Sequence, residues 1–256
     1  MRLGVSNLIA SSISASQLNE LYSLSDCIDW APTVTAPHWN LLTESGAAAF
    51  GLTTKISAIQ SLFYGINDVH FMQEEEKFLA FKNHIAYLIN VSKAYSAKYI
   101  LWGSPGTRNS ASALIDDKAL FKRLTQILSL FDNEDVKFMI EAVSPKFGCE
   151  FINNSIDLLS LHEQINHNNF SLHLDTGQMI EEGLDVLKVI ENNVDCLNHL
   201  HLSEPDFNYT GSYASLFKEI VSIVENKDID VVYEVQTLKS NMYDKFINEF
   251  SGVRSI

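Results

Sequence analysis

Apolar, strand-like segments alternate with amphipathic, helix-like segments along the whole chain, and this alternation is the strongest constraint on its fold. The strand-like segments are short and end in turn residues, whereas the segments between them repeat apolar residues three and four positions apart, as one face of a helix does. We expect strands at residues 3–7, 27–31, 56–62, 99–103, 136–142, 170–174, 197–202 and 230–235. We expect helices at residues 15–24, 43–50, 73–98, 119–131, 153–166, 183–193, 212–226 and 240–250.

Strands that alternate with helices form a parallel sheet, because each helix returns the chain to the edge where the next parallel strand begins. Eight such units predict an α/β protein with a closed (β/α)8 TIM barrel, a fold that commonly takes about 250 residues. A doubly wound open sheet is the alternative, but no Gly-x-Gly-x-x-Gly motif follows the first strand. No linker or low-complexity segment divides the chain, so we expect residues 1–256 to form a single domain.

The composition limits the partners and the location of the protein. With 32 Asp and Glu against 18 Lys and Arg, the net charge of −14 disfavours a nucleic-acid partner, whose phosphates are bound through cationic side chains. No apolar run approaches the ~18 residues of a membrane span, and the N-terminus has no signal-peptide pattern. Three separated cysteines without a Cys-x-x-Cys pair fit a reducing compartment, so we expect a cytoplasmic protein. The oligomeric state is left open, a homo-oligomer included.

Four of the later strands carry an acid or an imidazole at their C-terminal ends, where a barrel builds its active site. Glu141, Asp175 and Glu234 end apolar runs, and strand 197–202 carries His199 and His201 on one face. A carboxylate in such a position is costly to bury unless it is paired or bound to a metal, and few cations are available. Three carboxylates with an imidazole suit Mn²⁺ or Mg²⁺, with Co²⁺ or Zn²⁺ as alternatives. A purely structural network of ion pairs is the competing interpretation.

With these residues in place, the chain resembles the xylose isomerase-like TIM barrels, which include sugar epimerases and isomerases, inosose dehydratases and endonuclease IV. The resemblance extends over nearly the whole chain, strand by strand, and includes the motif Leu174-Asp175-Thr176-Gly177. It implies that the metal ligands are Glu141, Asp175, His201 and Glu234. His201 rather than His199 matches the family's histidine, because that residue precedes a short turn with an acid, here Ser203-Glu204.

The chain departs from the family's pattern at several positions. Gln178 stands where the strand-six motif normally ends in histidine, and Phe207 stands where ketose 3-epimerases carry arginine. Endonuclease IV needs further histidines on its third and fourth strands, where this chain has Gln60 and Gly103-Ser104. Because these ligands are missing and the chain is acidic, the sequence disfavours a role in DNA repair.

The resemblance implies a metal-dependent isomerase or epimerase that acts on a sugar, a sugar phosphate or a related polyol. Glu141 and Glu234 would transfer the proton through an enediolate, while Asp175 and His201 would mainly hold the metal. A dehydratase or lyase with the same metal and acids is one alternative. A non-catalytic barrel that binds a carbohydrate or a protein is the other.

Further residues near the strand ends are expected to contact the substrate. Arg108, in a loop rich in Pro and Gly, is the expected anion-binding residue, with a surface arginine as the alternative. The other expected substrate contacts are Gln60, Gln178, His199, Glu204 and Lys239. We expect His199 to lie one layer deeper than His201, as a supporting residue. Aromatic residues that could form a wall for a sugar ring are Trp30, Trp39, Phe63, Tyr64 and Phe207.

Overall fold

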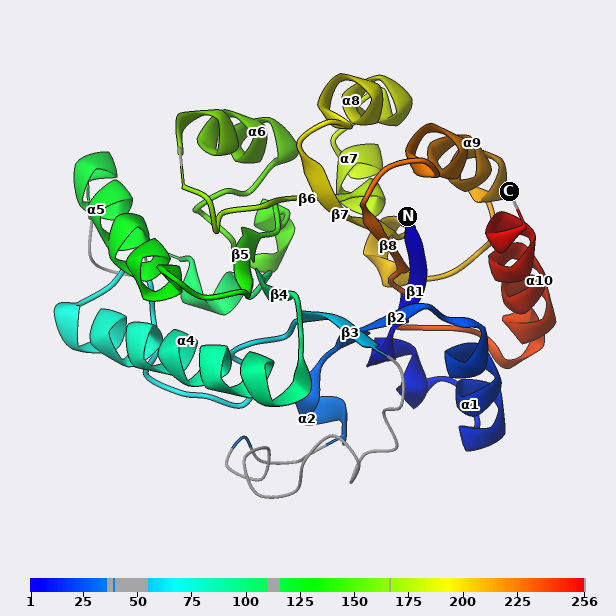
Figure 1. Ribbon diagram of the computed structural model, residues 1–256, viewed down its shortest axis with the longest axis horizontal. Helices are drawn as coiled ribbons and strands as arrows, with labels where there is room; N and C mark the ends of the chain where they lie inside the picture. The colour runs from blue at the N-terminus through cyan, green and yellow to red at the C-terminus, as the bar shows by residue number, and fades with distance from the viewer. Residues whose placement is uncertain (36–38, 40–54, 110–115, 166, 256) are drawn as a thin grey trace.

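Eight parallel strands form the centre of the structure and a ring of helices surrounds them (Figure 1). The computed structural model describes residues 1–35, 39, 55–109, 116–165 and 167–255. The strands are β1 (Arg2–Ser6), β2 (Cys27–Trp30), β3 (Lys55–Ile59), β4 (Tyr99–Trp102), β5 (Lys137–Ile140), β6 (Leu172–Asp175), β7 (Leu197–Leu202) and β8 (Asp230–Tyr233).

The order of the strands is that of a barrel. Each strand pairs with its neighbour in sequence, and β1 also pairs in parallel with β8, so the first and last strands lie side by side. Between β5 and β6 the pairing is reduced to a single bridge from Phe138 to Phe170, which leaves the barrel nearly closed. The structure therefore confirms the predicted single-domain (β/α)8 TIM barrel.

The helices of the described residues agree with the predicted pattern, with two short additions, α2 (Pro32–Thr35) and α7 (Thr176–Glu181). The others are α1 (Ala15–Leu24), α4 (Glu75–Tyr95), α5 (Asp117–Leu128), α6 (Ser155–Gln164), α8 (Val186–Asn193), α9 (Ala214–Val224) and α10 (Tyr243–Arg254). The short helix α7 was not predicted, because its six residues carry no full amphipathic repeat. The helix expected at 43–50 lies outside the described residues. None of the described helices is long and apolar enough to cross a membrane.

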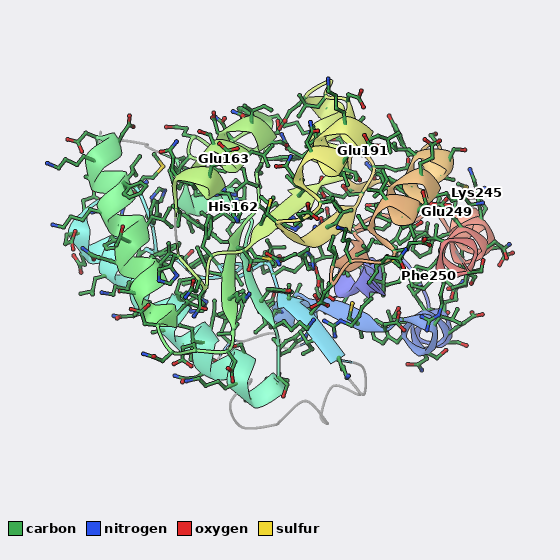
Figure 2. The ribbon with its side chains drawn as sticks, turned by 45° about the horizontal axis from the view of Figure 1, so that its top comes forward. His162, Glu163, Glu191, Lys245, Glu249 and Phe250 are labelled. Atoms are coloured by element: carbon green, nitrogen blue, oxygen red, sulfur yellow. The ribbon has the colours of Figure 1, made fainter. Side chains whose placement is uncertain are left out.

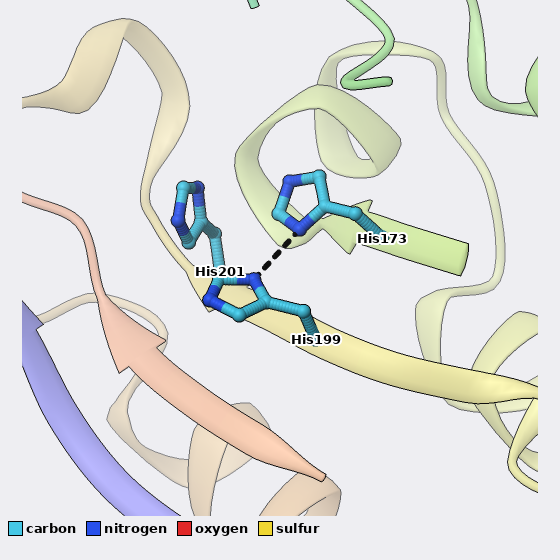
Figure 3. Close-up of side chains that lie close together, drawn as sticks. All are labelled: His173, His199 and His201. Atoms are coloured by element: carbon cyan, nitrogen blue, oxygen red, sulfur yellow. Dashed lines mark hydrogen bonds between the residues drawn. The ribbon is translucent and has the colours of Figure 1, made fainter. Parts of the chain in front are cut away.

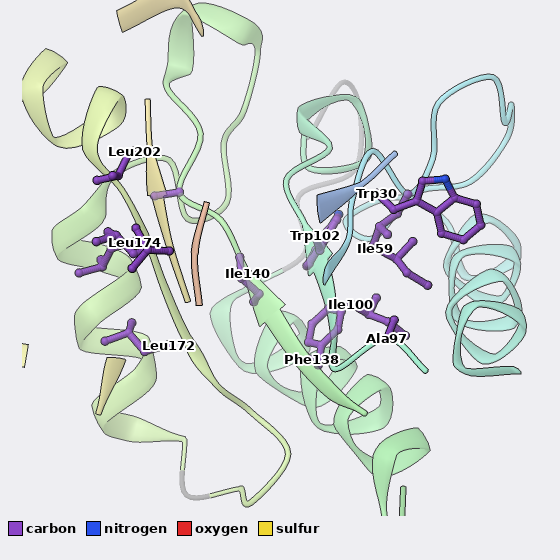
Figure 4. Close-up of a cluster of buried hydrophobic side chains, with 14 of the residues drawn as sticks. Trp30, Ile59, Ala97, Ile100, Trp102, Phe138, Ile140, Leu172, Leu174 and Leu202 are labelled. Carbon is purple, nitrogen blue, oxygen red and sulfur yellow. The ribbon is translucent and has the colours of Figure 1, made fainter. Parts of the chain in front are cut away.

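The apolar core lies between the strands and the helices. Side chains alternate along each strand, so Leu172 and Leu174 of β6 face the helices together with Ile140 and Phe138 of β5 (Figure 4). Large aromatic residues such as Trp102 fill the layer between β4 and α4. This layer holds the strands in the register that fixes the residues at their C-terminal ends.

The interior of the barrel is polar to an unusual degree. Barrel interiors are commonly filled by branched apolar side chains. Here the buried polar residues on or between the strands are Ser6, Asp29, Ser57, His173, His199, His201 and Asp230. Asp230 shows how such a residue is kept charged. Arg2 donates two hydrogen bonds to its carboxylate, and Ser57 Oγ donates a third at 2.7 Å.

The stability of the barrel should depend on Asp230. Burial opposes its ionisation, but the hydrogen bond and charge of Arg2 hold the pKa of this carboxyl below its usual value. A pKa that is lower in the folded than in the unfolded state stabilises the fold. This contribution is complete at pH values above the unfolded-state pKa of about 4, and it is lost as the pH falls through the folded-state pKa. Asp230→Asn should therefore lower the free energy of unfolding by about 2–3 kcal/mol at pH 7, as measured by urea denaturation.

The difference between Asp230→Asn and the unaltered protein should shrink below about pH 4. Asp195→Asn is the matched control, because this exposed carboxylate pairs only with Lys227 at the surface and its loss should not change stability measurably. Equal stability of the Asp230 variant and the control at pH 7 would show that the buried pair does not support the barrel.

Candidate metal centre

The C-terminal ends of four strands bring one imidazole and three carboxylates to a single point. Glu141 follows β5, Asp175 ends β6, His201 lies on β7 and Glu234 follows β8. Each offers a ligand atom within 4.8 Å of those of the others. His201 Nδ1 lies 3.0 Å from Glu234 Oε2, 3.7 Å from Glu141 Oε1 and 3.8 Å from Asp175 Oδ2. These four are the residues that the sequence pattern and the resemblance selected.

Two atoms of this group lack the hydrogen bonds that buried polar atoms normally make. His201 Nδ1 and Glu234 Oε2 are buried, and neither has a hydrogen-bond partner within the described part of the chain. They nevertheless lie only 3.0 Å apart. Burial opposes a charge on the imidazole, but Glu234 raises the pKa of His201 well above its usual value, so a proton would bridge the two atoms wherever no cation does. A divalent cation would satisfy both atoms and complete its shell with carboxylate oxygens. The residues present therefore fit a metal ion.

Asp29 of β2 orients the histidine of this group from the opposite side of the barrel. Its Oδ2 lies 2.7 Å from His201 Nε2, and its Oδ1 lies 3.1 Å from His199 Nε2. Burial alone would raise the pKa of Asp29, but the charges and hydrogen bonds of the two histidines hold it well below its usual range. The ionised carboxylate accepts both Nε2–H groups, which leaves His201 Nδ1 to face the three carboxylates. Carboxylates commonly orient metal-binding histidines in this way.

The hydrogen-bond chain continues from His199 to His173 (Figure 3). The two Nδ1 atoms are 2.9 Å apart, so His173 Nδ1 donates if His199 carries its own proton on Nε2. His173 Nε2 is then unprotonated, and it lies 3.9 Å from Glu141 Oε1. Burial and the neighbouring histidines lower the pKa of His173 well below its usual value, so the ring is neutral. Two buried imidazoles, His199 and His173, thus lie beneath the site.

The turn after β6 fixes Asp175. Ser203 Oγ donates to Asp175 Oδ2 at 2.7 Å and accepts the Gly177 amide at 2.9 Å, while the Gln178 amide donates to Asp175 Oδ1 at 2.7 Å. A Cβ atom on Gly177 would lie 2.5 Å from Ser203 Oγ, so only glycine allows this approach. Burial, with the charges of Glu141 and Glu234, raises the pKa of Asp175 to about 7. A bound cation would relieve this repulsion.

Glu141 is positioned by its neighbours on β4 and in the loop that follows. A Cβ atom on Gly103 would lie 1.9 Å from Glu141 Oε2, so the carboxylate occupies space that any other residue would fill. Arg108 Nη1 donates to the carbonyl oxygens of Glu141 at 2.9 Å and Phe151 at 3.3 Å. Arg108 is fully buried, so the alternative interpretation of a surface arginine is wrong. In its buried position, Arg108 supports the backbone that carries Glu141.

Two of the residues expected to contact substrate use their polar groups within the protein. Gln178 Oε1 accepts the Ser144 amide at 2.9 Å, and its Nε2 donates to Glu182. Glu204 Oε1 accepts the Gly211 amide at 2.6 Å, and its other oxygen accepts the Thr210 amide at 3.1 Å. Both side chains thus fix loops around the mouth of the barrel.

The remaining expected contacts are placed differently. Gln60 is buried and lines a cavity of about 600 Å³ at the mouth of the barrel, which Glu141 and Glu234 also line. His199 is fully buried beneath the site, in the deeper layer that we expected. Lys239 is exposed on the loop after β8 and does not line this cavity.

Phe207 separates this cavity from a small crevice beside Asp175, because it lines both. Its φ of 56° is unusual for a bulky residue, and the preceding Asp206 has a φ of 60°. The amides of Gln236 and Thr237 hold this turn by donating to the Phe207 carbonyl at 3.0 and 3.2 Å. Helix α10 supports the same loop from outside, since Lys245 donates to the Thr210 carbonyl at 2.9 Å and the neighbouring Glu249 accepts a bond from Tyr209 (Figure 2).

Asp29 and His173 were not predicted as site residues. His173 alternates with Asp175 on β6, so the argument that placed His199 and His201 on one face also applies to it. Asp29 is a lone acid between Ile28 and Trp30 in an apolar strand, which is the signal of a buried, paired carboxylate.

Comparison with known proteins agrees with the fold. The profile of the family described as xylose isomerase-like TIM barrel matches residues 45–247, and the chain belongs to that family. The comparison with curated proteins gave no match. One similar solved structure is 3-keto-D-glucoside 4-epimerase YcjR from E. coli, which has 16% identity over 100% of both chains and a TM-score of 0.76. D-psicose 3-epimerase from Clostridium cellulolyticum H10 has 16% identity over 100% of this chain and 97% of its own, with a TM-score of 0.69.

A third similar structure is named as a dehydratase rather than an epimerase. The probable 3-DHS dehydratase AsbF from Bacillus anthracis has 16% identity over 99% of both chains and a TM-score of 0.65. At these identities the likeness establishes the shared fold.

The metal affinity should depend on Asp29. Asp29→Asn removes the charge that holds the Nε2 proton on His201, so the histidine is no longer fixed with Nδ1 toward the carboxylates. We expect Mn²⁺ to bind about 10- to 100-fold more weakly, as measured by isothermal titration calorimetry. Asp206→Asn is the control, since Asp206 lies exposed at the rim in a left-handed conformation that asparagine also adopts. An unchanged Mn²⁺ affinity in Asp29→Asn would contradict this role.

Proposed function

We propose that the protein is a divalent-metal-dependent isomerase or epimerase of a sugar or a related polyol, with Mn²⁺ or Mg²⁺ as the expected metal and Co²⁺ or Zn²⁺ as alternatives. One observation carries this proposal. Glu141 and Glu234 belong to the group of four metal-binding side chains and also line the large cavity at the mouth of the barrel. A substrate in that cavity would meet two carboxylates beside the metal position. The epimerases among the similar structures support an enzyme of this kind.

The chain's own residues would divide the work. Asp175 and His201 would hold the metal together with the two glutamates, and the metal would stabilise the negative charge that develops on the substrate oxygens. Burial raises the pKa of Glu234, which brings this carboxyl closer to the range in which it can both accept and donate a proton. It would take the proton from the carbon next to the substrate carbonyl.

Glu141 would serve the other side of the substrate. Strands β5 and β8 are not neighbours in the barrel, since β6 and β7 lie between them on one side, so their carboxylates approach a bound sugar from different directions. One glutamate would remove the proton and the other would return one. Return to the same carbon from the opposite face gives epimerisation, and return to the neighbouring carbon gives isomerisation. Expulsion of a hydroxyl group instead would give the dehydratase alternative.

The proposal predicts exchange of a carbon-bound proton with solvent. The Mn²⁺-loaded protein should incorporate deuterium next to the carbonyl of its sugar substrate in D₂O, as followed by NMR. Glu234→Gln should slow this exchange at least about 100-fold, because the amide cannot take the proton. Glu181→Gln, which removes another carboxylate near the mouth, is the control and should retain activity.

The same experiment separates the alternatives. Loss of water from the sugar would identify a dehydratase, and wild-type exchange rates in Glu234→Gln would remove this residue from the mechanism. Absence of exchange with every sugar tried, together with absence of Mn²⁺ binding, would leave the non-catalytic barrel.

A further inference from the structure

We propose that this site takes an uncharged sugar of two rings, with the reacting ring at Glu141 and Glu234 and the second ring against an apolar wall that includes Tyr64. The inference rests on the proposed function and narrows its substrate class. It excludes sugar phosphates and sugar acids, which the sequence alone left open.

No cation is available to bind an anionic group in the cavity. The chain has 18 Lys and Arg, and all of them lie in the described ranges, because the remaining segments contain neither residue. None of the described residues that line the cavity is Lys or Arg, and its charged lining residues are Glu141 and Glu234. Because the proposed metal ion would engage these two glutamates, a phosphate or carboxylate group elsewhere in the cavity would find no cationic side chain among the described lining residues, which disfavours its binding.

The cations closest to the mouth are engaged elsewhere. Arg108 is buried beneath the backbone of Glu141, and Lys245 binds carbonyl oxygens of the loop after β7. Lys146 Nζ lies 2.7 Å from Asp206 Oδ1 and also pairs with Glu181. Lys146 and Lys245 thus already have partners that a substrate anion would have to displace. Arg108 Nε and Nη2 have no hydrogen-bond partner among the described residues, but Arg108 is fully buried and does not line the cavity, and neither does the exposed Lys239.

Backbone amides do not replace the missing cations. Barrels often bind phosphate through the loops after the seventh and eighth strands. Here the amides of Gln236 and Thr237 donate to the Phe207 carbonyl, and those of Thr210 and Gly211 donate to Glu204. These four amides in the two loops are thus occupied within the protein. These four amides are therefore not free to bind a phosphate group.

The size of the cavity favours more than one ring. A six-carbon sugar has about 12 non-hydrogen atoms and needs roughly 200 Å³ at protein packing density. The cavity offers about 600 Å³, which accommodates a second ring beyond the one at the glutamates.

The outer part of the cavity suits a sugar ring. Its wall combines the apolar side chains of Phe63, Tyr64 and Ile66 with the amide of Gln236 and with Gln60, whose Nε2 already donates to Ser6 Oγ. The Tyr64 side chain is 72% exposed, yet its backbone is fixed, because its carbonyl accepts Trp39 Nε1 at 2.9 Å and its amide donates to the Ser61 carbonyl at 3.1 Å. An exposed aromatic ring on a fixed backbone can pack against the C–H face of a sugar, while amides bind its hydroxyl groups.

Three sugars test the inference: a two-ring sugar with a free keto group, the corresponding single-ring ketose, and the phosphate ester of that ketose. We expect deuterium exchange with a kcat/KM at least about tenfold higher for the two-ring sugar than for the free ketose, since binding of the remote ring adds to transition-state stabilisation. The phosphate should react at least about 100-fold more slowly than the free ketose. Tyr64→Ala should remove most of the advantage of the second ring, whereas Phe121→Ala, an exposed aromatic residue on α5, should not.

Calorimetric titration of the same sugars separates this inference from the proposed function. Preference for the phosphate, or equal affinity for one and two rings, would overturn the inference even if exchange occurs. If the two-ring sugar binds most tightly but nothing exchanges, the binding inference holds and the isomerase proposal fails.

Discussion

Repulsion among the carboxylates of Glu141, Asp175 and Glu234 is the interaction on which the organisation of this protein depends. Like charges in a buried space raise one another's pKa values, and burial with Glu141 and Glu234 does this to Asp175. The chain holds these groups together through the barrel itself, because each is attached to the end of a different strand. A divalent cation would turn this repulsion into attraction, and the proposed metal site would explain why His201 Nδ1 and Glu234 Oε2 are buried without hydrogen-bond partners among the described residues.

The polar interior of the barrel follows from the same requirement. A metal-binding imidazole must present a lone pair, so the proton on its other nitrogen needs an acceptor. Asp29 provides the acceptor from across the barrel and also accepts His199 Nε2, and His199 Nδ1 pairs with His173 Nδ1. His173 Nε2 has no hydrogen-bond partner among the described residues. Apolar side chains would pack there as well, but they could not fix which nitrogen of His201 faces the carboxylates. The core between strands and helices supplies the apolar burial that this interior lacks.

Local patterns in the sequence predicted the fold, and the same patterns together with the family resemblance selected the four central side chains. Alternation along a strand determines which side chains share a face, and the end of an apolar run shows where a strand delivers its polar group. Local patterns could not predict pairing across the barrel, which joins residues such as Asp29 and His201 that lie 172 positions apart. Loop residues were the least predictable. The side chain of Arg108 points inward beneath Glu141. Gln178 uses its amide oxygen to accept the Ser144 amide and its amide nitrogen to donate to Glu182. Whether a polar loop residue faces substrate or supports backbone depends on tertiary contacts that no local pattern contains.

The central claim is that one divalent ion joins residues from β5, β6, β7 and β8. A crystal structure of the protein grown with Mn²⁺, with data collected at the manganese absorption edge, tests it most directly. We predict a strong anomalous peak at the barrel mouth, bonded to Glu141, Asp175, Glu234 and the Nδ1 atom of His201. Full occupancy of other sites by manganese with no peak at this position, or a peak bonded to His201 through Nε2, would contradict the account.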